Sequence, residues 1–449
     1  MKFSKNPYWL KSGLFTLMER VSIQIFRFGA FYLLIRGLSK EDFGIWTLFL
    51  IITTFLEEGQ IGLIRKPLIR LFSATEDHKT QAKILTSSLT LNTLLSFGIA
   101  MLIWGYSWVH PRMWDLPALG EMLQVYIGSW MLMILLNQFT FLQQAHLQFR
   151  GTFLTHLFRQ GFFFGYVIVI ALMPDGQFEL VSLAYWQLWS VLLGVIVAVL
   201  TGWKYARFSS YPEKKWVMRL FGSGKFIAGT RIGIWVVKSI DQLMLGALVS
   251  PAAVATYSTT VRITNLVEVP TQSMADIVFP QSTRKFHKTG KAPVKRIYEK
   301  SVGILLAMIV PGLLFIFLFP EFVLRFVAGE QYVDAVPLLQ ITLLFGLFLP
   351  FARQFGTILD TLGKSQLNLY LILISIGLNI LFNSWFIPQF GTMGAAYGTL
   401  ITYFLIFIAH QVILYREIQA KPQNILWYAR KVYGSGFKLM YQKVGGILS

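Results

Sequence analysis

Apolar stretches of about twenty residues alternate with short polar stretches along almost the whole chain. A helix needs about 20 mostly apolar residues to cross a bilayer, and twelve segments of the sequence meet that length. They run over 12–35, 43–64, 84–108, 120–145, 153–173, 180–203, 219–248, 253–282, 301–320, 332–359, 365–387 and 393–415. The pattern predicts an all-α polytopic membrane protein with twelve transmembrane helices.

The basic residues between these segments are unevenly distributed. With the N-terminus placed in the cytoplasm, 29 of the 40 Lys and Arg residues fall in cytoplasmic loops and tails, if Arg219 and Lys225 at the cytoplasmic end of segment 219–248 are counted with them; four fall in the opposite loops and seven deeper inside segments. Because cytoplasmic loops carry an excess of Lys and Arg, this distribution predicts that both termini are cytoplasmic. Contact with anionic membrane lipids then accounts for most of the net charge of +19, without a nucleic-acid partner.

The remaining composition excludes several kinds of site. Cysteine is absent, so disulfides, thiol catalysis and thiolate metal sites are excluded. The six His residues lack the spacing of metal ligands, and we expect neither a metal nor another cofactor. Phosphate-binding loops, dinucleotide-binding glycine patterns and nucleophile elbows are also missing from the sequence. These absences argue against an ATP-driven pump and a hydrolase, and we expect a transporter that makes no bonds.

The chain contains an internal repeat at an offset of 211 residues. Residues 12–31 align without gaps on residues 223–242, and the register continues through Ser39 and Ser250. Charges coincide at three separate depths, and the coincident pairs are Arg20 with Arg231, Arg27 with Lys238, and Glu57 with Glu268. Apolar coincidences arise easily between hydrophobic segments, whereas three coincident charges do not.

The offset spans six segments, so the two copies share one orientation in the membrane. This is the pattern of a parallel repeat, with two six-helix lobes related by an axis along the membrane normal and a substrate site at their junction. We expect an N-terminal lobe over 1–203, a basic cytoplasmic linker over 204–218, a C-terminal lobe over 219–415 and an amphipathic cytoplasmic tail over 416–449.

The repeated charges predict ion pairs within each lobe. Arg20 and Arg27 are seven residues apart and therefore share one helix face. Arg20 and Glu57 lie at similar distances from the cytoplasmic ends of their segments, which predicts an Arg20–Glu57 pair, with Glu58 and Glu19 as competing partners. The repeat predicts the equivalent Arg231–Glu268 pair.

Two interpretations of these charges stay open at the level of the sequence. Lys238 could pair with Asp241, whereas Arg27 has no clear partner. The charges either join packed helices or line a water-filled cavity that binds an anion, since an unpaired charge at mid-bilayer costs at least ~2.5 kcal/mol. The candidate anion-binding residues are Arg27, Lys238, Arg20, Arg231 and Arg262. The candidate carriers of a coupling H⁺ or Na⁺, or structural ion-pair partners, are Glu57, Glu58, Glu268, Asp276 and Asp241.

Two stretches resemble a known family. The sequence LLIRGLSKEDFGIWTLFL (33–50) is similar to the first outer turn of the bacterial polysaccharide flippases that move O-antigen-type repeat units, and IDQLMLGALVSPAAVATYSTTVRI (240–263) resembles its equivalent in the second half. These flippases belong to the multidrug/oligosaccharidyl-lipid/polysaccharide exporter superfamily. The twelve-segment layout extends the resemblance over essentially the whole chain.

The resemblance implies a function and a set of partners. It implies two lobes with a cationic cavity, and a flippase that carries an undecaprenyl-pyrophosphate-linked oligosaccharide across the bacterial inner membrane by alternating access. Other implied partners are membrane lipids, a glycan polymerase and glycosyltransferases. A multidrug exporter of the same superfamily and a non-transporting membrane component of glycan synthesis are the alternatives.

Overall fold

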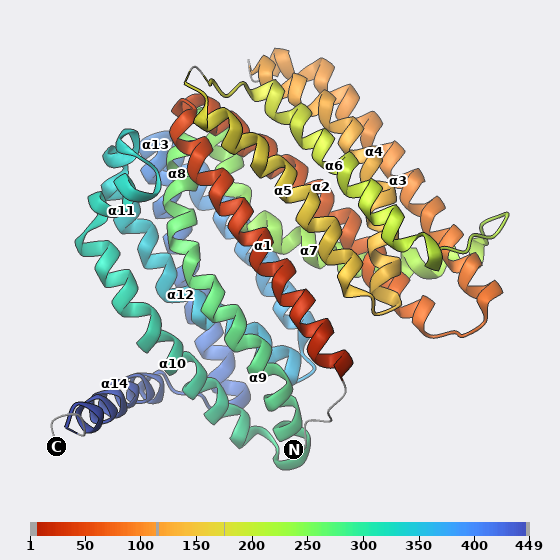
Figure 1. Ribbon diagram of the computed structural model, residues 1–449. Helices are drawn as coiled ribbons and strands as arrows, with labels where there is room; N and C mark the ends of the chain where they lie inside the picture. Colours follow the sequence, from red (N-terminus) through yellow and green to blue (C-terminus); the bar gives the residue numbers. More distant parts are fainter. Residues whose placement is uncertain (1–6, 114–115, 175, 446–449) are drawn as a thin grey trace. The chain divides into compact units, whose positions relative to one another are not determined.

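The structure is a computed structural model that describes residues 7–113, 116–174 and 176–445. The outermost residues of the predicted N-terminal lobe and of the predicted tail, 1–6 and 446–449, lie outside the described residues. Within the described ranges every regular element is a helix (Figure 1). The chain divides into two compact units, Met1–Val236 (unit 1) and Val237–Ser449 (unit 2).

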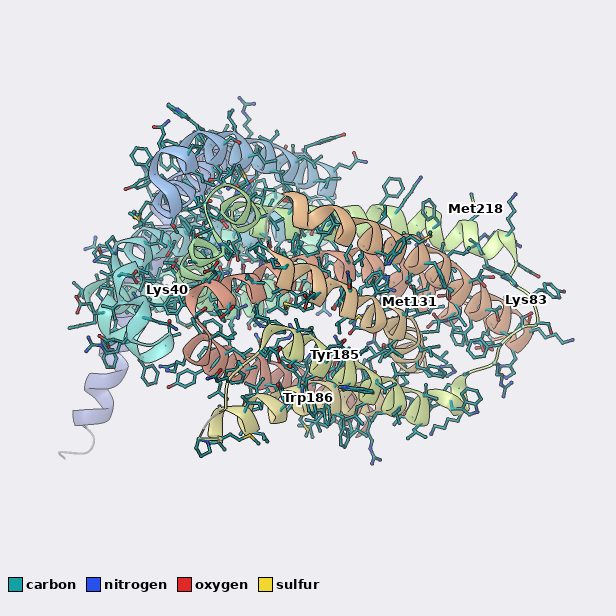
Figure 2. All side chains as sticks on the ribbon, turned by 90° about the horizontal axis from the view of Figure 1, so that it is seen from above. Lys40, Lys83, Met131, Tyr185, Trp186 and Met218 are labelled. Atoms are coloured by element: carbon teal, nitrogen blue, oxygen red, sulfur yellow. The ribbon has the colours of Figure 1, made fainter. Side chains whose placement is uncertain are left out.

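Unit 1 is built around helix α4. Its elements are α1 (Pro7–Gly37), α2 (Lys40–Ser73), α3 (His78–Met113), α4 (Pro117–Ala145), α5 (Phe149–Leu172), α6 (Leu180–Gly202), the 3₁₀ helix η1 (Trp203–Tyr205) and most of α7 (Lys214–Leu248). Helix α4 contacts α2, α3, α5 and α6, and α1 packs chiefly on α5. Figure 2 shows Lys83 and Met218 near one end of this unit and Lys40 toward the opposite end.

Unit 2 has the same plan around helix α12. Its elements are the end of α7, α8 (Pro251–Thr264), η2 (Asn265–Val267), α9 (Glu268–Thr289), α10 (Lys291–Leu318), α11 (Pro320–Val327), η3 (Glu330–Ala335), α12 (Val336–Thr361), α13 (Ser365–Ile418) and α14 (Pro422–Gly445). Helix α12 contacts α8, α9, α10 and α13, as α4 does its neighbours in unit 1. Helix α14 packs on α10 and has no counterpart among the described elements of unit 1.

All twelve predicted segments are helical, although they differ in hydropathy. In the described residues, eight helices are long and apolar enough to cross a membrane, and one of them, α13, contains two predicted segments. The three segments that fail this criterion are 12–35, 219–248 and 253–282, which correspond to α1, α7 and the α8–α9 pair. These are the segments that carry most of the intramembrane charges.

The helix ends confirm the 211-residue register. Helix α1 ends at Gly37 and α7 at Leu248, and α2 begins at Lys40 and α8 at Pro251, each pair being 211 residues apart. Ser39 and Ser250 act as N-caps, because their hydroxyls accept hydrogen bonds from the backbone N–H of Asp42 and Ala253 respectively. The two halves therefore share helix boundaries and capping chemistry as well as sequence.

The eighth predicted segment is not continuous, and the prediction of one helix over 253–282 is wrong. Helix α8 ends at Thr264, a 3₁₀ turn follows over 265–267, and α9 begins at Glu268. Pro270 explains the break, because it lacks the N–H that would bond to the carbonyl of Leu266. The equivalent position in the unbroken helix α2 is Gly59.

The last two predicted segments are confirmed as separate helical stretches. They meet at Gly391, whose φ of 56° and ψ of −129° interrupt α13. Residues with a side chain rarely adopt this conformation. Beyond the kink the two stretches pack closely, because a Cβ at Gly394 would lie 2.2 Å from the carbonyl oxygen of Phe386.

The boundary between the units differs from the predicted linker over 204–218. That stretch belongs to unit 1, where the N–H of Ser209 donates to Thr86 and the N–H of Glu213 donates to Ser87. Lys83 also pairs with Glu213 at 2.7 Å. The first half of α7 then packs on α2, so the change of unit falls within α7. The contacts of this stretch with α3 could not be predicted from its polar composition.

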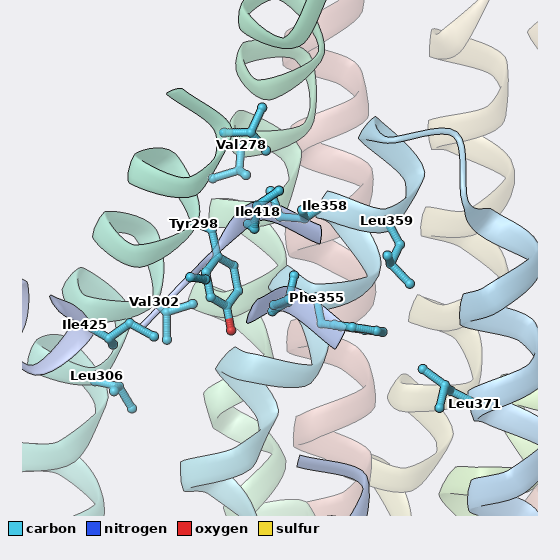
Figure 3. Packing of buried hydrophobic residues seen from close by; sticks show 13 residues of the cluster. Val278, Tyr298, Val302, Leu306, Phe355, Ile358, Leu359, Leu371, Ile418 and Ile425 are labelled. Atoms are coloured by element: carbon cyan, nitrogen blue, oxygen red, sulfur yellow. The ribbon is translucent and has the colours of Figure 1, made fainter. Parts of the chain in front are cut away.

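Each unit has its own apolar core. In unit 1, Leu63, Ile64 and Leu68 of α2 pack with Leu220 and Ala228 of α7. In unit 2, Tyr298, Val302 and Leu306 of α10 face Phe355 and Ile358 of α12 (Figure 3). Burial of a large apolar side chain stabilises a soluble fold by about 1.5–3 kcal/mol, but in lipid close van der Waals packing has to supply the stabilisation.

The α2–α7 contact gives a test of such packing. A Cβ at Gly224 would lie 2.1 Å from the carbonyl oxygen of Leu63, whereas a Cβ at Gly222 would meet no atom within 4 Å. We expect Gly224→Ala to lower the melting temperature of the purified protein, because overpacking costs about 1–3 kcal/mol. Gly222→Ala is the matched control and should leave the melting temperature unchanged or slightly higher. Equal melting temperatures for the two variants would contradict this contact.

Candidate functional site

Unit 1 brings charged residues of three helices together within the apolar region. Glu57 of α2 lies 4.0 Å from the Nη2 atom of Arg159 of α5, and the hydroxyl of Tyr126 of α4 donates to its carboxylate at 3.5 Å. Arg27 of α1 is exposed and lies within electrostatic range of Glu57, Glu58 and Arg159. The single carboxylate of Glu57 is thus within electrostatic range of two guanidinium groups, and these three side chains together carry a formal charge of +1.

The predicted Arg20–Glu57 and Arg231–Glu268 pairs are wrong. Arg231 forms an ion pair with Glu58 instead, and Arg20 is an exposed residue near Glu19 and Arg65. Similar depth in the membrane was the basis of the prediction, but the direction of a side chain around the helix axis decides its partner. Adjacent residues of a helix point about 100° apart, so Glu57 faces α4 and α5 while Glu58 faces α7.

A second polar group lies beside this cluster. Glu19 of α1 is 3.7 Å from Nε2 of His156 on α5, a contact that is an ion pair only when the imidazole is protonated. Arg65 donates from Nε to the side chain of Gln144 at 3.0 Å. Helices α1, α2 and α5 thus all contribute polar groups to one region of unit 1.

Arg159 was missed as a candidate site residue. It is not among the candidate residues that the repeat and the charge pattern named, but its side chain is only 12% exposed and lies 4.0 Å from Glu57. The repeat could not reveal it, because the equivalent position in the second half is Tyr370. Its one available signal was an arginine within a predicted transmembrane segment.

In unit 2 the repeated lysine and glutamate form a direct pair. The Nζ atom of Lys238 donates to both carboxylate oxygens of Glu268, at 2.6 and 2.8 Å. Both side chains are partly exposed. Lys238 therefore takes the partner that was predicted for Arg231, and the predicted Lys238–Asp241 contact does not form.

Asp241 is the centre of a separate buried cluster in unit 2. The hydroxyl of Tyr257 on α8 donates to Oδ2 of Asp241, and the hydroxyl of Thr399 on α13 lies 3.5 Å from the same oxygen. The amide of Asn379 donates to Thr399 at 3.1 Å, and that of Asn383 donates to Asn379 at 2.9 Å. Helix α7, helix α8 and both stretches of α13 meet here.

The electrostatics of this cluster are unusual for a buried acid. Among the described residues, Asp241 has no basic partner, and its ligands are hydroxyl groups and the backbone N–H of Gln242. The Oδ1 atom of Asn383 is also buried without a hydrogen-bond partner. A buried carboxylate without a cation is costly, so this arrangement favours a bound proton or a small cation coordinated by oxygen atoms.

The two remaining candidates lie on the surface of unit 2. Arg262 is exposed on α8, and Asp276 is exposed on α9, where it accepts a hydrogen bond from Gln272 at 2.8 Å. Groups of three or more His, Asp or Glu side chains that could bind a metal are absent from the described residues.

Comparison with known proteins agrees with this architecture. Residues 33–337 match the family described as polysaccharide biosynthesis protein. The chain belongs to this family. The match includes both stretches on which the sequence resemblance was based and extends from the end of α1 to the beginning of α12.

Two relatives and two solved structures extend the comparison. An uncharacterized membrane protein of Methanocaldococcus jannaschii is 24% identical over 53% of this chain and 48% of its own length. The probable low-salt glycan biosynthesis flippase Agl15 of Haloferax volcanii is 23% identical over 54% of this chain and 52% of its own length. The chain thus spans about half the length of these relatives.

The solved structures show the fold of this family member. An inward-facing multidrug resistance MATE family transporter of the MOP superfamily has a TM-score of 0.74 at 15% identity, covering 87% of this chain and 94% of its own. The lipid II flippase MurJ in an inward closed conformation has a TM-score of 0.73 at 13% identity, covering 93% and 90%. The protein is therefore a multi-pass membrane protein with the fold of this transporter superfamily.

Proposed function

We propose that the protein is a flippase that moves an undecaprenyl-pyrophosphate-linked oligosaccharide across the bacterial inner membrane, with both termini in the cytoplasm. The observation that carries this proposal is the cationic excess at Arg27, Arg159 and Glu57 within the apolar segments of a polysaccharide biosynthesis family member. Intramembrane charges are costly and therefore usually functional. A pyrophosphate is the part of such a substrate that an excess of guanidinium groups would recognise.

We assign different roles to Arg27 and to the cations that are held by acids. Arg27 is exposed beside an acid that Arg159 already approaches, so we assign the pyrophosphate contact to Arg27. Lys238 is held by both oxygens of Glu268, and it becomes available only when Glu268 is protonated or displaced. Arg20, Arg231 and Arg262 contribute to the positive potential along the proposed path of the substrate.

The coupling ion binds, we propose, at Asp241. The cluster of Asp241, Tyr257 and Thr399 offers carboxylate and hydroxyl oxygens, which suit either H⁺ or Na⁺. Asp241 connects α7 with α8 and α13 through its hydrogen bonds. Binding of the ion to Asp241 therefore changes the stability of one arrangement of these helices relative to another. A ligand shifts a conformational equilibrium only by its differential affinity for the two states, and such a difference is what alternating access requires.

The proposed function can be tested with the purified full chain in proteoliposomes. A lipid-linked oligosaccharide placed in one leaflet should become accessible to an external glycosidase on the opposite side only when the protein is present. The same vesicles without protein are the control. Efflux of a cationic dye without glycan translocation would favour a multidrug exporter, and movement of neither would favour a non-transporting component of glycan synthesis.

A further inference from the structure

A cavity at one end of unit 1 is lined by basic and aromatic side chains, and the intramembrane charges described above are not among them. Its volume is about 140 Å³. Helices α2 and α3, the residue that follows α4 and the segment after α6 contribute the lining residues, which are Phe72, His78, Gln81, His146, Lys204, Tyr205 and Arg207. None of the lining side chains is a carboxylate, so the cavity is built for an anion or for a neutral hydrogen-bonding group.

The aromatic residues hold the wall of the cavity in place. The ring of His146 lies between Phe72, at 5.2 Å, and Tyr205, at 4.7 Å between centroids. The Nδ1 atom of His146 is 3.1 Å from the carbonyl oxygen of Leu142 at the end of α4. Because a carbonyl oxygen can only accept, this contact favours the tautomer of His146 that carries its proton on Nδ1.

The two basic residues of the cavity are available for a ligand. Lys204 and Arg207 are exposed, and in the described residues neither forms an ion pair with an acid. Lys204 instead lies over the ring of Tyr205, with its Nζ atom 4.9 Å from the centroid. The nearby Asp77 is engaged elsewhere, because its carboxylate accepts hydrogen bonds from the backbone N–H groups of Lys79 and Thr80.

The surroundings place the cavity at the level of lipid headgroups. Trp203, Phe208 and Tyr211, in the same segment, are 64%, 43% and 61% exposed. Aromatic side chains of this kind are enriched at membrane–water interfaces, and basic pockets between transmembrane helices bind anionic headgroups. We propose that this cavity binds a phosphate group through Lys204 and Arg207, supplied by an anionic phospholipid or by a soluble phosphate ester.

The test uses a double variant of the full chain, Lys204→Gln with Arg207→Gln. The matched control is Lys215→Gln with Arg219→Gln, because these two exposed cations lie over the ring of Trp216 at 5.4 and 5.1 Å and are not among the lining residues of the cavity. Melting temperatures are measured in nanodiscs of phosphatidylglycerol and of phosphatidylcholine, whose trimethylammonium group balances its phosphate. They are also measured in detergent with inorganic pyrophosphate or with sodium chloride at equal ionic strength.

The two sources of phosphate give different results. A higher melting temperature in phosphatidylglycerol, retained by the control and lost by the cavity variant, identifies a lipid headgroup. The same pattern with pyrophosphate identifies the phosphate group of a soluble compound. Loss of two cations, each contributing about 1 kcal/mol, weakens binding about thirtyfold. Equal losses in both double variants, or no rise with either probe, would overturn the proposal. Arg207→Gln alone serves if the double variant does not fold.

Discussion

Asp241→Asn is expected to abolish ion-driven translocation in proteoliposomes without lowering the melting temperature of the protein. The amide has nearly the shape of the carboxyl group, and its oxygen can still accept hydrogen bonds from Tyr257 and Thr399, while its nitrogen replaces the oxygen that accepts from the backbone N–H of Gln242. It cannot gain or lose a proton, and it attracts a cation far less strongly. Removing an unpaired buried charge also removes its desolvation cost, and this gain offsets the lost hydrogen bond from Gln242. The melting temperature should therefore stay near that of the wild type while transport is lost.

The same acid-to-amide change at a second position distinguishes loss of ion coupling from a general effect of removing a negative charge. Asp276 is an exposed acid whose hydrogen bond is to Gln272 of the same helix, and Asp276→Asn should transport as the wild type does. Sodium chloride, compared with choline chloride, should raise the melting temperature of the wild type but not of Asp241→Asn if the ion is Na⁺. If the ion is H⁺, an imposed pH gradient alone should drive transport. Normal gradient-driven transport by Asp241→Asn would refute the coupling role.

The cluster around Asp241 also shows why the internal repeat predicted the framework better than the site. The repeat equivalents of Asp241, Tyr257 and Thr399 are Ala30, Trp46 and Leu188. In unit 1 the ring of Trp46 stacks with Phe49 and Phe163 in place of a polar cluster. The helix ends were duplicated, whereas the chemistry at this position was not. An alignment of the two halves therefore finds the scaffold but not the acid site.

Other features were predictable to the extent that they depend on local sequence. Ser39 and Ser250 mark helix starts because capping depends on a few neighbouring residues. The break before Glu268 could have been predicted from Pro270. The partners of Glu57 and Glu58 depend on which helices surround α2 and on the direction of each side chain. Counting residues along the helix gives the depth of a charge but not its neighbours.

Arg27→Ala is expected to remove most glycan translocation while the protein is produced and folded at normal levels. A hydrogen bond to a charged group contributes about 1.5–3 kcal/mol, so loss of the pyrophosphate contact should weaken substrate binding roughly 10- to 150-fold. Translocation is measured with the glycosidase assay at several substrate concentrations. Arg36→Ala is the control on the same helix, because Arg36 lies over the ring of Tyr32 at the end of α1.

A further variant distinguishes substrate binding by Arg27 from simple balance of the nearby acid. If Arg27 serves only to neutralise Glu57, the double variant Arg27→Ala with Glu57→Gln should recover transport, because the carboxylate that needed Arg27 is then absent as well. If Arg27 binds the pyrophosphate, the double variant should remain inactive, and Arg27→Lys should recover part of the activity by restoring the charge without the bidentate geometry. Recovery in the double variant would therefore assign Arg27 a structural role and leave the substrate contact to Arg159.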